Sequence, residues 1–291
     1  MRVSDLMTFF PNAEQKEFPS YDEKYLSIPY GEKYLWIPNE WLSEKEKSLI
    51  AALAPNSVST NKELGNHFWY KVLFGNQGIP HEKRSYRVIQ LKMPLLDEKN
   101  DYQKIWQESF KAFFPKKVDA FFLSNVDYLL IEELSDQALY MEDLEGIFTT
   151  LDMDFGITTY AFIGEFYEDT QNINRLFHEE RKIFQQESEI LHGKQVFRFA
   201  DVALHYFTKD KIGDSRIIEY TKEKILHEDE AFRQLVRMMW KHFGNITSVS
   251  KEMYTHRNTI NYRIDRLAEQ AGINLKNPDD LMLCYLILLD E

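Results

Sequence analysis

Apolar residues near the C-terminus recur at the spacing of a helix. Ile260, Ile264 and Leu267 stand at positions i, i+4 and i+7, so they share one stripe of a helical surface. This pattern predicts a helix over residues 255–270. The positions between the stripe residues are almost all polar, so most of the helix is expected to face solvent or a partner.

A second, shorter helix is predicted directly before it. Its apolar residues Ile246, Val249 and Met253 form a stripe that faces the first one. Asn245 or Thr247 is expected to cap its start, since both are good N-cap residues. Only a residue or so separates the two helices, and two short helices joined by a tight turn have the layout of a helix-turn-helix.

Helices are also predicted on either side of this pair. One covers 230–243 and is broken by Gly244-Asn245. The other starts at "NPDD" and continues through "LMLCYLILL", residues 281–289. This run is apolar on all sides but, at nine residues, too short to span a bilayer. Such a helix is expected either to lie in the core or to be shared with a partner.

Upstream, from Ser85, strand and helix patterns alternate. Strands are predicted over 86–93, 118–125, 127–134 and 156–166, and helices over 101–114, 141–155 and 172–191. The order β-α-β-β-α-β-α is that of the ferredoxin-like arrangement, with helices on one face of an antiparallel sheet. The predicted fold class is therefore α+β, with an α/β sandwich domain followed by an all-α domain.

The N-terminal residues show weaker patterns. A β-hairpin is predicted over 25–38. The next segment predicts a helix in which Ser43 and Glu46 form a capping box. Its apolar face is expected to hold Leu49, Ile50 and Leu53.

These patterns divide the chain into three predicted domains. The N-terminal segment covers 1–82, and residues 56–80 in it look like a connection with one aromatic cluster, "HFWYKVLF". The α/β domain covers 83–193. The helical domain covers 194–291, starts with a mixed link over 194–213, and has its helix-turn-helix core at 231–291.

Charge is distributed unevenly along the chain. The net charge of −12 argues against a protein whose whole surface binds polyanions. Residues 231–291, however, hold 8 Lys and Arg against 7 Asp and Glu, so the acidity lies in the first 230 residues. With 44% hydrophobic residues the chain can bury a sizeable core.

Two further features bear on compartment and chemistry. The single cysteine, Cys284, excludes an intrachain disulfide framework and any Cys-based zinc cluster, and its apolar neighbours predict an inert core thiol. The N-terminus has no basic region followed by a long apolar one, so no signal peptide is predicted. A cytoplasmic protein that does not enter a membrane is expected.

The polar face of the 255–270 helix is the strongest candidate site. Its first two turns carry no carboxylate, because Asp265 and Glu269 lie toward the C-terminal half. Thr255 is expected to point outward with the polar residues of these turns. Such side chains hydrogen-bond base edges and phosphates, and a helix N-terminus favours phosphate. With two residues of the preceding helix, the candidate DNA-binding residues are His256, Arg257, Asn258, Thr259, Asn261, Tyr262, Arg263, Arg266, Thr247 and Lys251. The alternative is a polar helix whose face is simply solvated.

Residues 244–289 resemble the C-terminal helix-turn-helix domain of PucR/CdaR-type bacterial transcription regulators. The resemblance rests on "HRNT" followed by "YR", then "G-I-x-L" and "P-D-D-L", in fixed spacing. It implies a Fis-like helix-turn-helix in which His256 and Arg257 reach bases. Thr259, Asn261 and Tyr262 would contact the backbone or a groove edge. Val249-Ser250 stand where the family usually has small alanines, which is expected to alter packing only.

The resemblance also bears on the middle domain. A degenerate GGDEF-like domain often precedes the DNA-binding domain in this family, and a GGDEF domain has the β-α-β-β-α-β order of elements predicted for 83–193. Here the second hairpin, "LSNVDYLLI", lacks the glycines that let a backbone approach a nucleotide. The first strand ends without the carboxylate that would hold Mg²⁺. Cyclase chemistry is therefore not supported, and neither an enzyme nor a cofactor is expected.

Other candidate chemistry is weak. Asp152 and Asp154 could form a metal or acid/base pair, but the end of a helix is the favoured interpretation, since residues two apart on a helix do not face each other. His178 is interpreted as a solvated helix residue rather than a ligand. The aromatic segments could line a ligand pocket, although an aromatic core is favoured. "MMW", residues 238–240, is interpreted as core.

The sequence thus predicts a sequence-specific transcription regulator that binds a double-stranded operator as a homodimer. It leaves room for a small-molecule effector of unknown identity. Two alternatives remain open. One is a protein-interaction or ligand-sensing module without enzymatic activity, whose helix-turn-helix no longer binds DNA. The other is an enzyme or nucleotide-binding protein that works through the middle domain.

Overall fold

The structure is a computed structural model. It describes residues 10, 13–16, 19–20, 24–30, 33–53, 64–75, 77–79, 84–93, 102–114, 119–124, 126–168, 172–188, 194–226 and 230–289. The chain divides into two compact units, Met1–Phe199 and Ala200–Glu291. Each unit is described by itself.

A small sheet opens the first unit. It consists of β1 (Glu14–Lys16), β2 (Tyr25–Tyr30) and β3 (Lys33–Pro38) in the order β1-β3-β2. β2 and β3 are antiparallel, with Tyr30 opposite Lys33, so the predicted hairpin is confirmed. The residues of its turn lie outside the described ranges. A short 3-10 helix, η1 (Asn39–Trp41), follows.

Helix α2 (Glu44–Leu53) follows and begins with the predicted capping box. The Glu46 carboxylate accepts the Ser43 N–H at 2.8 Å, and the Ser43 hydroxyl accepts the Glu46 N–H at 3.4 Å. Ile50 is buried and joins the small core that includes Leu35. The prediction for Leu49 was wrong, because its side chain is 59% exposed. The burial of Leu53, the third residue of the predicted face, lies outside what the structure describes.

A five-stranded sheet forms the centre of the first unit. Its strands are β4 (Tyr86–Lys92), β5 (Asp119–Phe122), β6 (Asp127–Glu133), β7 (Tyr160–Ile163) and β8 (Val196–Phe197). The order is β5-β6-β4-β7-β8; the first four are antiparallel, and β8 pairs parallel with β7. β8 was not predicted, because its two residues lie in the segment expected to be a mixed link.

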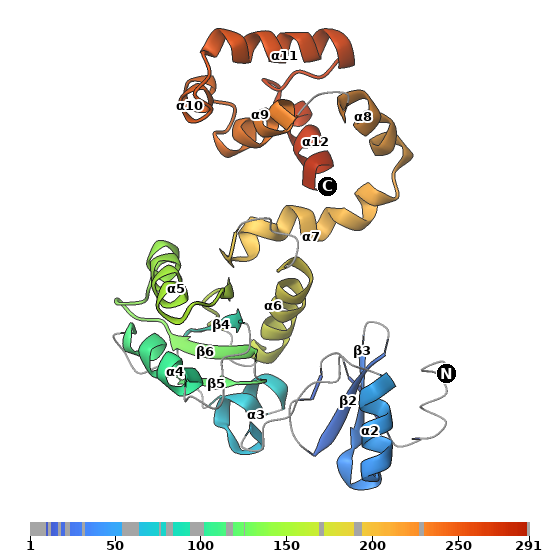
Figure 1. Cartoon of the computed structure of the whole chain (residues 1–291), viewed down its shortest axis with the longest axis vertical. Helices are drawn as coiled ribbons and strands as arrows, with labels where there is room; N and C mark the ends of the chain where they lie inside the picture. Colours follow the sequence, from blue (N-terminus) through green and yellow to red (C-terminus); the bar gives the residue numbers. More distant parts are fainter. Residues whose placement is uncertain are drawn as a thin grey trace. The chain divides into compact units, whose positions relative to one another are not determined.

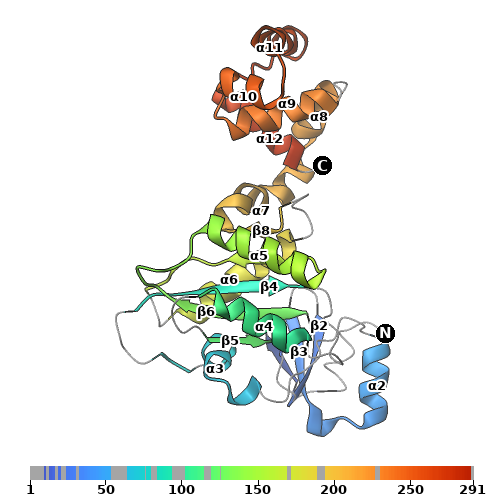
Figure 2. The ribbon, with the colours of Figure 1, turned by 60° about the vertical axis from the view of Figure 1, so that its left-hand side comes forward.

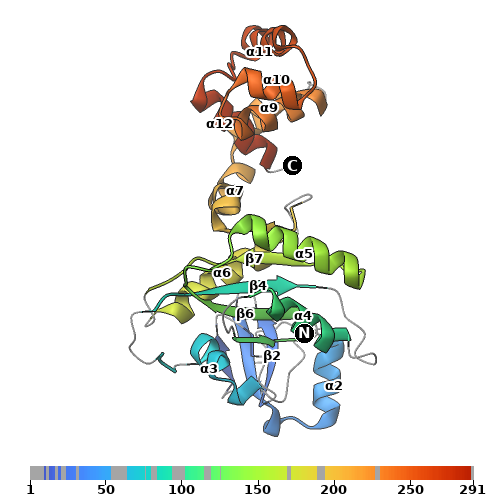
Figure 3. The same ribbon diagram turned by 90° about the vertical axis from the view of Figure 1, so that its left-hand side faces the viewer.

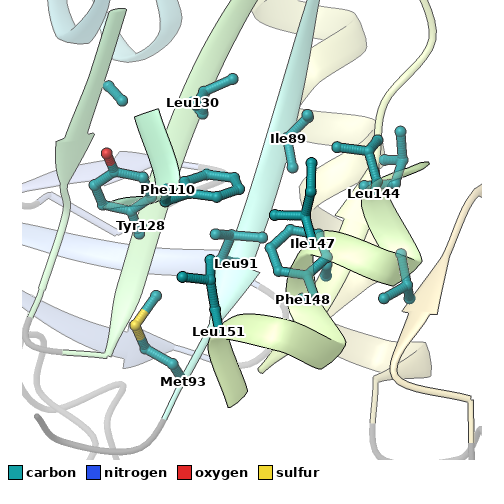
Figure 4. Packing of buried hydrophobic residues seen from close by; sticks show 14 of the residues in the cluster. Ile89, Leu91, Met93, Phe110, Tyr128, Leu130, Leu144, Ile147, Phe148 and Leu151 are labelled. Carbon is teal, nitrogen blue, oxygen red and sulfur yellow. The ribbon is translucent and has the colours of Figure 1, made fainter. Parts of the chain in front are cut away.

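Two helices cover one face of this sheet (Figure 2). They are α4 (Tyr102–Ala112) and α5 (Met141–Phe155), both predicted from sequence. Ile89 and Leu91 of β4 point from the sheet toward Phe148 of α5, and Phe110 of α4 lies beside them (Figure 4). All four side chains are at most 1% exposed. The alternation along β4 therefore directs its odd-numbered residues into this core.

Helices also cover the other face, so the prediction of helices on one face only was wrong. Val88 of β4 and Leu129 of β6 pack there with Phe177 of α6 (Ile173–Glu187) and Trp69 of α3 (Phe68–Phe74). Helix α3 lies in the segment predicted as a connection. Five consecutive residues of β4 are buried, which is the pattern of a strand covered on both faces.

The second unit is helical. Its elements are α7 (Phe199–Gly213, whose first residue belongs to the first unit), α8 (Arg216–Leu226), α9 (Glu230–Lys241), α10 (Ile246–Glu252), α11 (Arg257–Ala271) and α12 (Pro278–Leu289). Residues from each helix from α8 through α12 form one apolar core. No helix within the described ranges is long and apolar enough to cross a membrane.

Helix α12 supplies much of this core. Leu281, Cys284, Ile287 and Leu288 are buried, and the Tyr285 ring stacks on Trp240 of α9 with 4.4 Å between centroids. The helix was expected either to lie in the core or to be shared with a partner, and within the second unit it lies in the core. Burial raises the pKa of the Cys284 thiol to about 12, as expected of an inert core thiol.

Candidate nucleic-acid interface

The helix-turn-helix pair is α10 and α11. In Figure 1 α11 is seen side-on and α10 end-on, and in Figure 3 the reverse, so the two helices cross at a large angle. Val249 of α10 is completely buried against Ile260 and Ile264 of α11, which are 1% and 0% exposed. The predicted stripes therefore meet, and they hold α11 at the periphery of the unit with its opposite face uncovered.

The start of each helix is capped by a side chain. Asn245 caps α10: its Oδ1 accepts the N–H groups of Thr247 and Ser248, each at 3.1 Å. Of the two predicted caps, Asn245 is thus the one used. His256 caps α11, because its Nδ1 accepts the Asn258 N–H at 3.2 Å. The Thr259 and Ile260 N–H groups donate to the His256 carbonyl at 2.9 and 3.3 Å.

The turn between the helices is tight. Helix α10 ends in a Schellman motif: the Tyr254 N–H donates to the Lys251 carbonyl at 3.3 Å, and the Thr255 N–H to the Ser250 carbonyl at 3.0 Å. Thr255 is half-buried, and its hydroxyl donates to the Met253 carbonyl at 3.0 Å. The expectation that Thr255 points outward was wrong, since its hydroxyl closes the turn instead.

The candidate residues gather along the uncovered side of α10 and α11. His256, Arg257, Asn258 and Thr259 form the exposed first turn of α11. Asn258, Tyr262 and Arg266 follow one another at intervals of four, so they line one exposed ridge. Asn261 and Arg263 are half-buried at its sides. Thr247 and Lys251 are exposed on α10.

Two carboxylates close to this surface, Glu252 and Asp265, are paired with cations. The Lys241 ammonium lies 2.6 Å from the Glu252 carboxylate, and His242 also bonds it. These hydrogen bonds, that of Lys241 first, lower the pKa of Glu252. Asp265 pairs with Lys276 at 3.3 Å. Sequence reasoning missed the role of Glu252, because its partners lie ten and eleven positions away across a turn and no periodicity connects them.

Outside this surface, the groups singled out from the sequence serve packing. The Asp152 carboxylate accepts the Thr159 N–H at 2.9 Å and its hydroxyl at 2.6 Å, so it closes the connection from α5 to β7. His178 is not the solvated residue predicted: its ring packs on Phe74 and Phe177, and burial lowers its pKa to about 3. Within the described ranges no three His, Cys, Asp or Glu side chains form a group that could hold a metal ion.

Residues 232–289 match the family model of the PucR C-terminal helix-turn-helix domain. The match runs from α9 through α12 and so includes both helices of the pair and the core that supports them. The second unit therefore carries a PucR-type helix-turn-helix, and the coarse prediction of a regulator of this type is supported.

Relatives extend the comparison beyond the PucR-type domain. A leucine-rich protein of Streptococcus dysgalactiae subsp. equisimilis is 23% identical over 98% of this chain and 99% of its own length. The uncharacterized protein YxkF of Bacillus subtilis (strain 168) is 22% identical over 90% of this chain and 89% of its own. The carbohydrate diacid regulator of Escherichia coli (strain K12) is 35% identical over 69 residues, which are 23% of this chain and 18% of that one.

Among solved structures, a regulator of polyketide synthase expression from Bifidobacterium adolescentis aligns with 78% of this chain and 95% of its own. The identity is 13% and the TM-score 0.33, which is too low to indicate a shared fold over the whole chain.

Proposed function

We propose that this protein is a DNA-binding transcription regulator that recognises its operator with α11. The observation that carries the proposal is the exposed, carboxylate-free first half of α11, presented by a PucR-type helix-turn-helix. In a helix-turn-helix the N-terminal residues of the second helix reach base edges in the major groove. The corresponding residues here carry the donors and acceptors that such contacts use.

The candidate residues are proposed to contact different parts of the DNA, according to their positions on the two helices. His256 and Arg257 stand at the N-terminal tip and are proposed to contact bases, with Asn258 beside them. Thr259 at the end of the first turn and Asn261 and Tyr262 in the second would contact a groove edge or the DNA backbone. The remaining exposed or half-exposed candidates, whose charge or hydroxyl suits phosphate, are Arg263, Arg266, Thr247 and Lys251.

The small number of cations favours a dimer. The helical segment 231–291 is nearly neutral, so one copy has few phosphate contacts and should bind weakly. Two copies on a two-fold operator, with half-sites about 34–36 Å apart, would double the contacts. We propose that the protein works as such a homodimer in the cytoplasm.

The middle of the chain is proposed to be a degenerate GGDEF-like module over 83–193 that signals or dimerises. Its support is the ferredoxin-like strand order β5-β6-β4-β7 within a β-α-β-β-α-β sequence. Because the hairpin glycines and the metal-binding carboxylate are missing, incubation with GTP and Mg²⁺ or Mn²⁺ should yield no cyclic dinucleotide above a heat-killed control. Formation of that product would favour the enzyme alternative.

Selection from random DNA tests the main proposal. The purified full-length chain is mixed with random duplexes, and bound fragments are recovered and sequenced. A shared, two-fold symmetric motif is the expected result. Arg257→Ala should abolish its enrichment, while Arg237→Ala, which removes a cation paired with Glu230 on α9, should retain it. Recovery of unenriched sequence from a folded wild-type chain would favour the interaction-module alternative.

A further inference from the structure

Four described helix ends place a residue in the left-handed backbone region, and they do so with different residues. Helices α5 and α11 use Gly156 (φ 65°) and Gly272 (φ 72°). Helix α9 ends with Phe243 (φ 51°) followed by Gly244 (φ 75°), and helix α10 ends with Tyr254 (φ 50°) followed by Thr255. Bulky side chains are rare in this region, because Cβ comes too close to the backbone, and glycine avoids the strain.

The backbone itself does not require aromatic residues at these positions. Both ends form Schellman motifs: Phe243 and Gly244 donate to the carbonyls of Trp240 and Met239, as Tyr254 and Thr255 do to those of α10. A glycine would make the same hydrogen bonds with less strain. The hydrogen bonds of the turn therefore do not account for a tyrosine at position 254.

Packing within the described unit does not explain Tyr254 either. Its side chain is 97% exposed, whereas Tyr262 on α11 is 66% exposed. An exposed aromatic residue held in a strained conformation is a feature associated with function. These two properties of Tyr254 are those expected of a residue that contacts a binding partner.

The surroundings of Tyr254 indicate a polyanion. The exposed cation Lys251 lies three residues before it, and His256 and Arg257 follow in the first turn of α11. The adjacent carboxylate, Glu252, is paired with Lys241 and His242. A phenolic hydroxyl is a hydrogen-bond donor, and tyrosine is among the side chains that bond DNA phosphates.

We propose that Tyr254 donates its hydroxyl to a phosphate of the operator, next to the bases that the tip of α11 reads. The proposal rests on the proposed function and adds a contact outside α10 and α11. The turn places the ring directly before the N-terminus of α11, so the bonded phosphate would anchor the depth and register of that helix. Phe243 shares the backbone strain and the 97% exposure but has no donor.

Tyr254→Phe tests the hydrogen bond. The full-length variant is titrated with a duplex recovered by selection with the wild-type chain, and with a random-sequence duplex of the same length. Loss of one hydrogen bond should weaken both affinities by the same factor, about 3- to 10-fold. The slope of log affinity against log salt should not change, because no cation is lost. Lys251→Ala, in contrast, should reduce that slope by about one.

Tyr254→Gly separates a binding role from a structural one. It relieves the backbone strain, so the midpoint of thermal unfolding should not fall and is expected to rise by up to a few degrees. DNA affinity should nevertheless fall at least as far as in Tyr254→Phe. Phe243→Gly is the matched control, with the same relief of strain and an affinity within twofold of wild type. Opposite changes in stability and affinity at Tyr254 alone are the expected signature.

Other results would overturn the proposal. If Tyr254→Phe and Tyr254→Gly bind like wild type while Arg257→Ala binds weakly, the proposed function stands and the Tyr254 contact does not. If the Tyr254 variants lower the mass in light scattering without DNA, the ring belongs to a protein interface instead. If the wild-type chain binds neither duplex, the failure lies with the proposed function.

Discussion

Helices α11 and α12 pack into the same core but differ in polarity: α11 is mostly polar, whereas α12 is mostly apolar. Of the 15 residues of α11, three are buried in one stripe, and the rest are mostly polar. Of the 12 residues of α12, four are buried, and four of the other eight are apolar and half-buried. The unit thus obtains stability from α12 and needs only a narrow stripe to hold α11. That division leaves the opposite face of α11 uncovered within the unit.

The largest effect is expected from a charge placed in α12. Leu288 is 6% exposed, and Leu288→Asp would bury a carboxylate without a partner, which should cost about 4 kcal/mol or more and unfold the C-terminal unit. Circular dichroism and limited proteolysis measure the loss. Met282→Asp, at a side chain 41% exposed, is the control and should stay folded. A folded Leu288→Asp chain with wild-type mass would contradict the core position of α12.

The stripe of α11 should be the next most sensitive. Ile264 is fully buried, so Ile264→Ala should cost about 2–5 kcal/mol of stability, through the transfer of its methyl groups and the cavity left behind. Urea unfolding measures this cost. A loss below about 1 kcal/mol would mean that α11 is barely attached and that its contrast with α12 is greater than described.

A substitution on the exposed side of α11 should change DNA affinity rather than the stability of the fold. Arg257→Ala should leave the unfolding midpoint unchanged, because the side chain is exposed. It should cost about 1–3 kcal/mol on the selected duplex and relax base preference at one position. Titration of selected and random duplexes measures both. An equal loss on the two duplexes would show a contact to phosphate only.

The caps of the two helices give a finer comparison. Asn277 caps α12 by accepting the Asp279 N–H at 2.8 Å, ahead of Pro278 at the first helical position. Asn277→Ala should cost about 1 kcal/mol of stability and leave DNA affinity unchanged. His256→Ala should cost less stability but lower the affinity. Affinity that falls equally in both variants would mean that α12 shapes the DNA-binding face.

The smallest effect is expected from acid. The pKa of Glu252 is lowered in the folded chain, so its contribution to stability is present above the ordinary pKa of 4.5 and is lost as pH falls below that value. Since the carboxylate joins α10 to α9, acid should loosen the support of α11 rather than α12. Melting curves from pH 6 to pH 3 should show a shallower decline for Glu252→Gln. Identical curves would assign Glu252 no such role.

How far the sequence could predict this molecule depended on the kind of signal. The stripe of Ile260 and Ile264 and the capping box of Ser43 depend on residues within two turns, so periodicity found them. Helix α3 was missed because its aromatic residues pack on nearly all sides and show no polar face. β8 was missed because two residues carry no period, and only pairing with β7 identifies the strand.

Contacts between distant residues were the general limit. The coverage of both sheet faces appears in the structure as a continuous buried run in β4. The sequence of this strand contains Arg87 and Gln90, so its pattern did not indicate a strand covered on both faces. His178 looked solvated because its charged neighbours dominate the local sequence, whereas its burial comes from α3. The strained backbone at Tyr254 likewise has no counterpart in a pattern of apolar and polar positions.

The cap at the start of α11 also determines the tautomer of its imidazole. Because Nδ1 of His256 accepts the Asn258 N–H, that nitrogen carries no proton, and the neutral ring holds its proton on Nε2. The outer edge of the ring can then only donate. Opposite a base it would suit guanine N7 or O6 and reject the amino groups of adenine and cytosine. A backbone hydrogen bond inside the protein would in this way contribute to the choice of base.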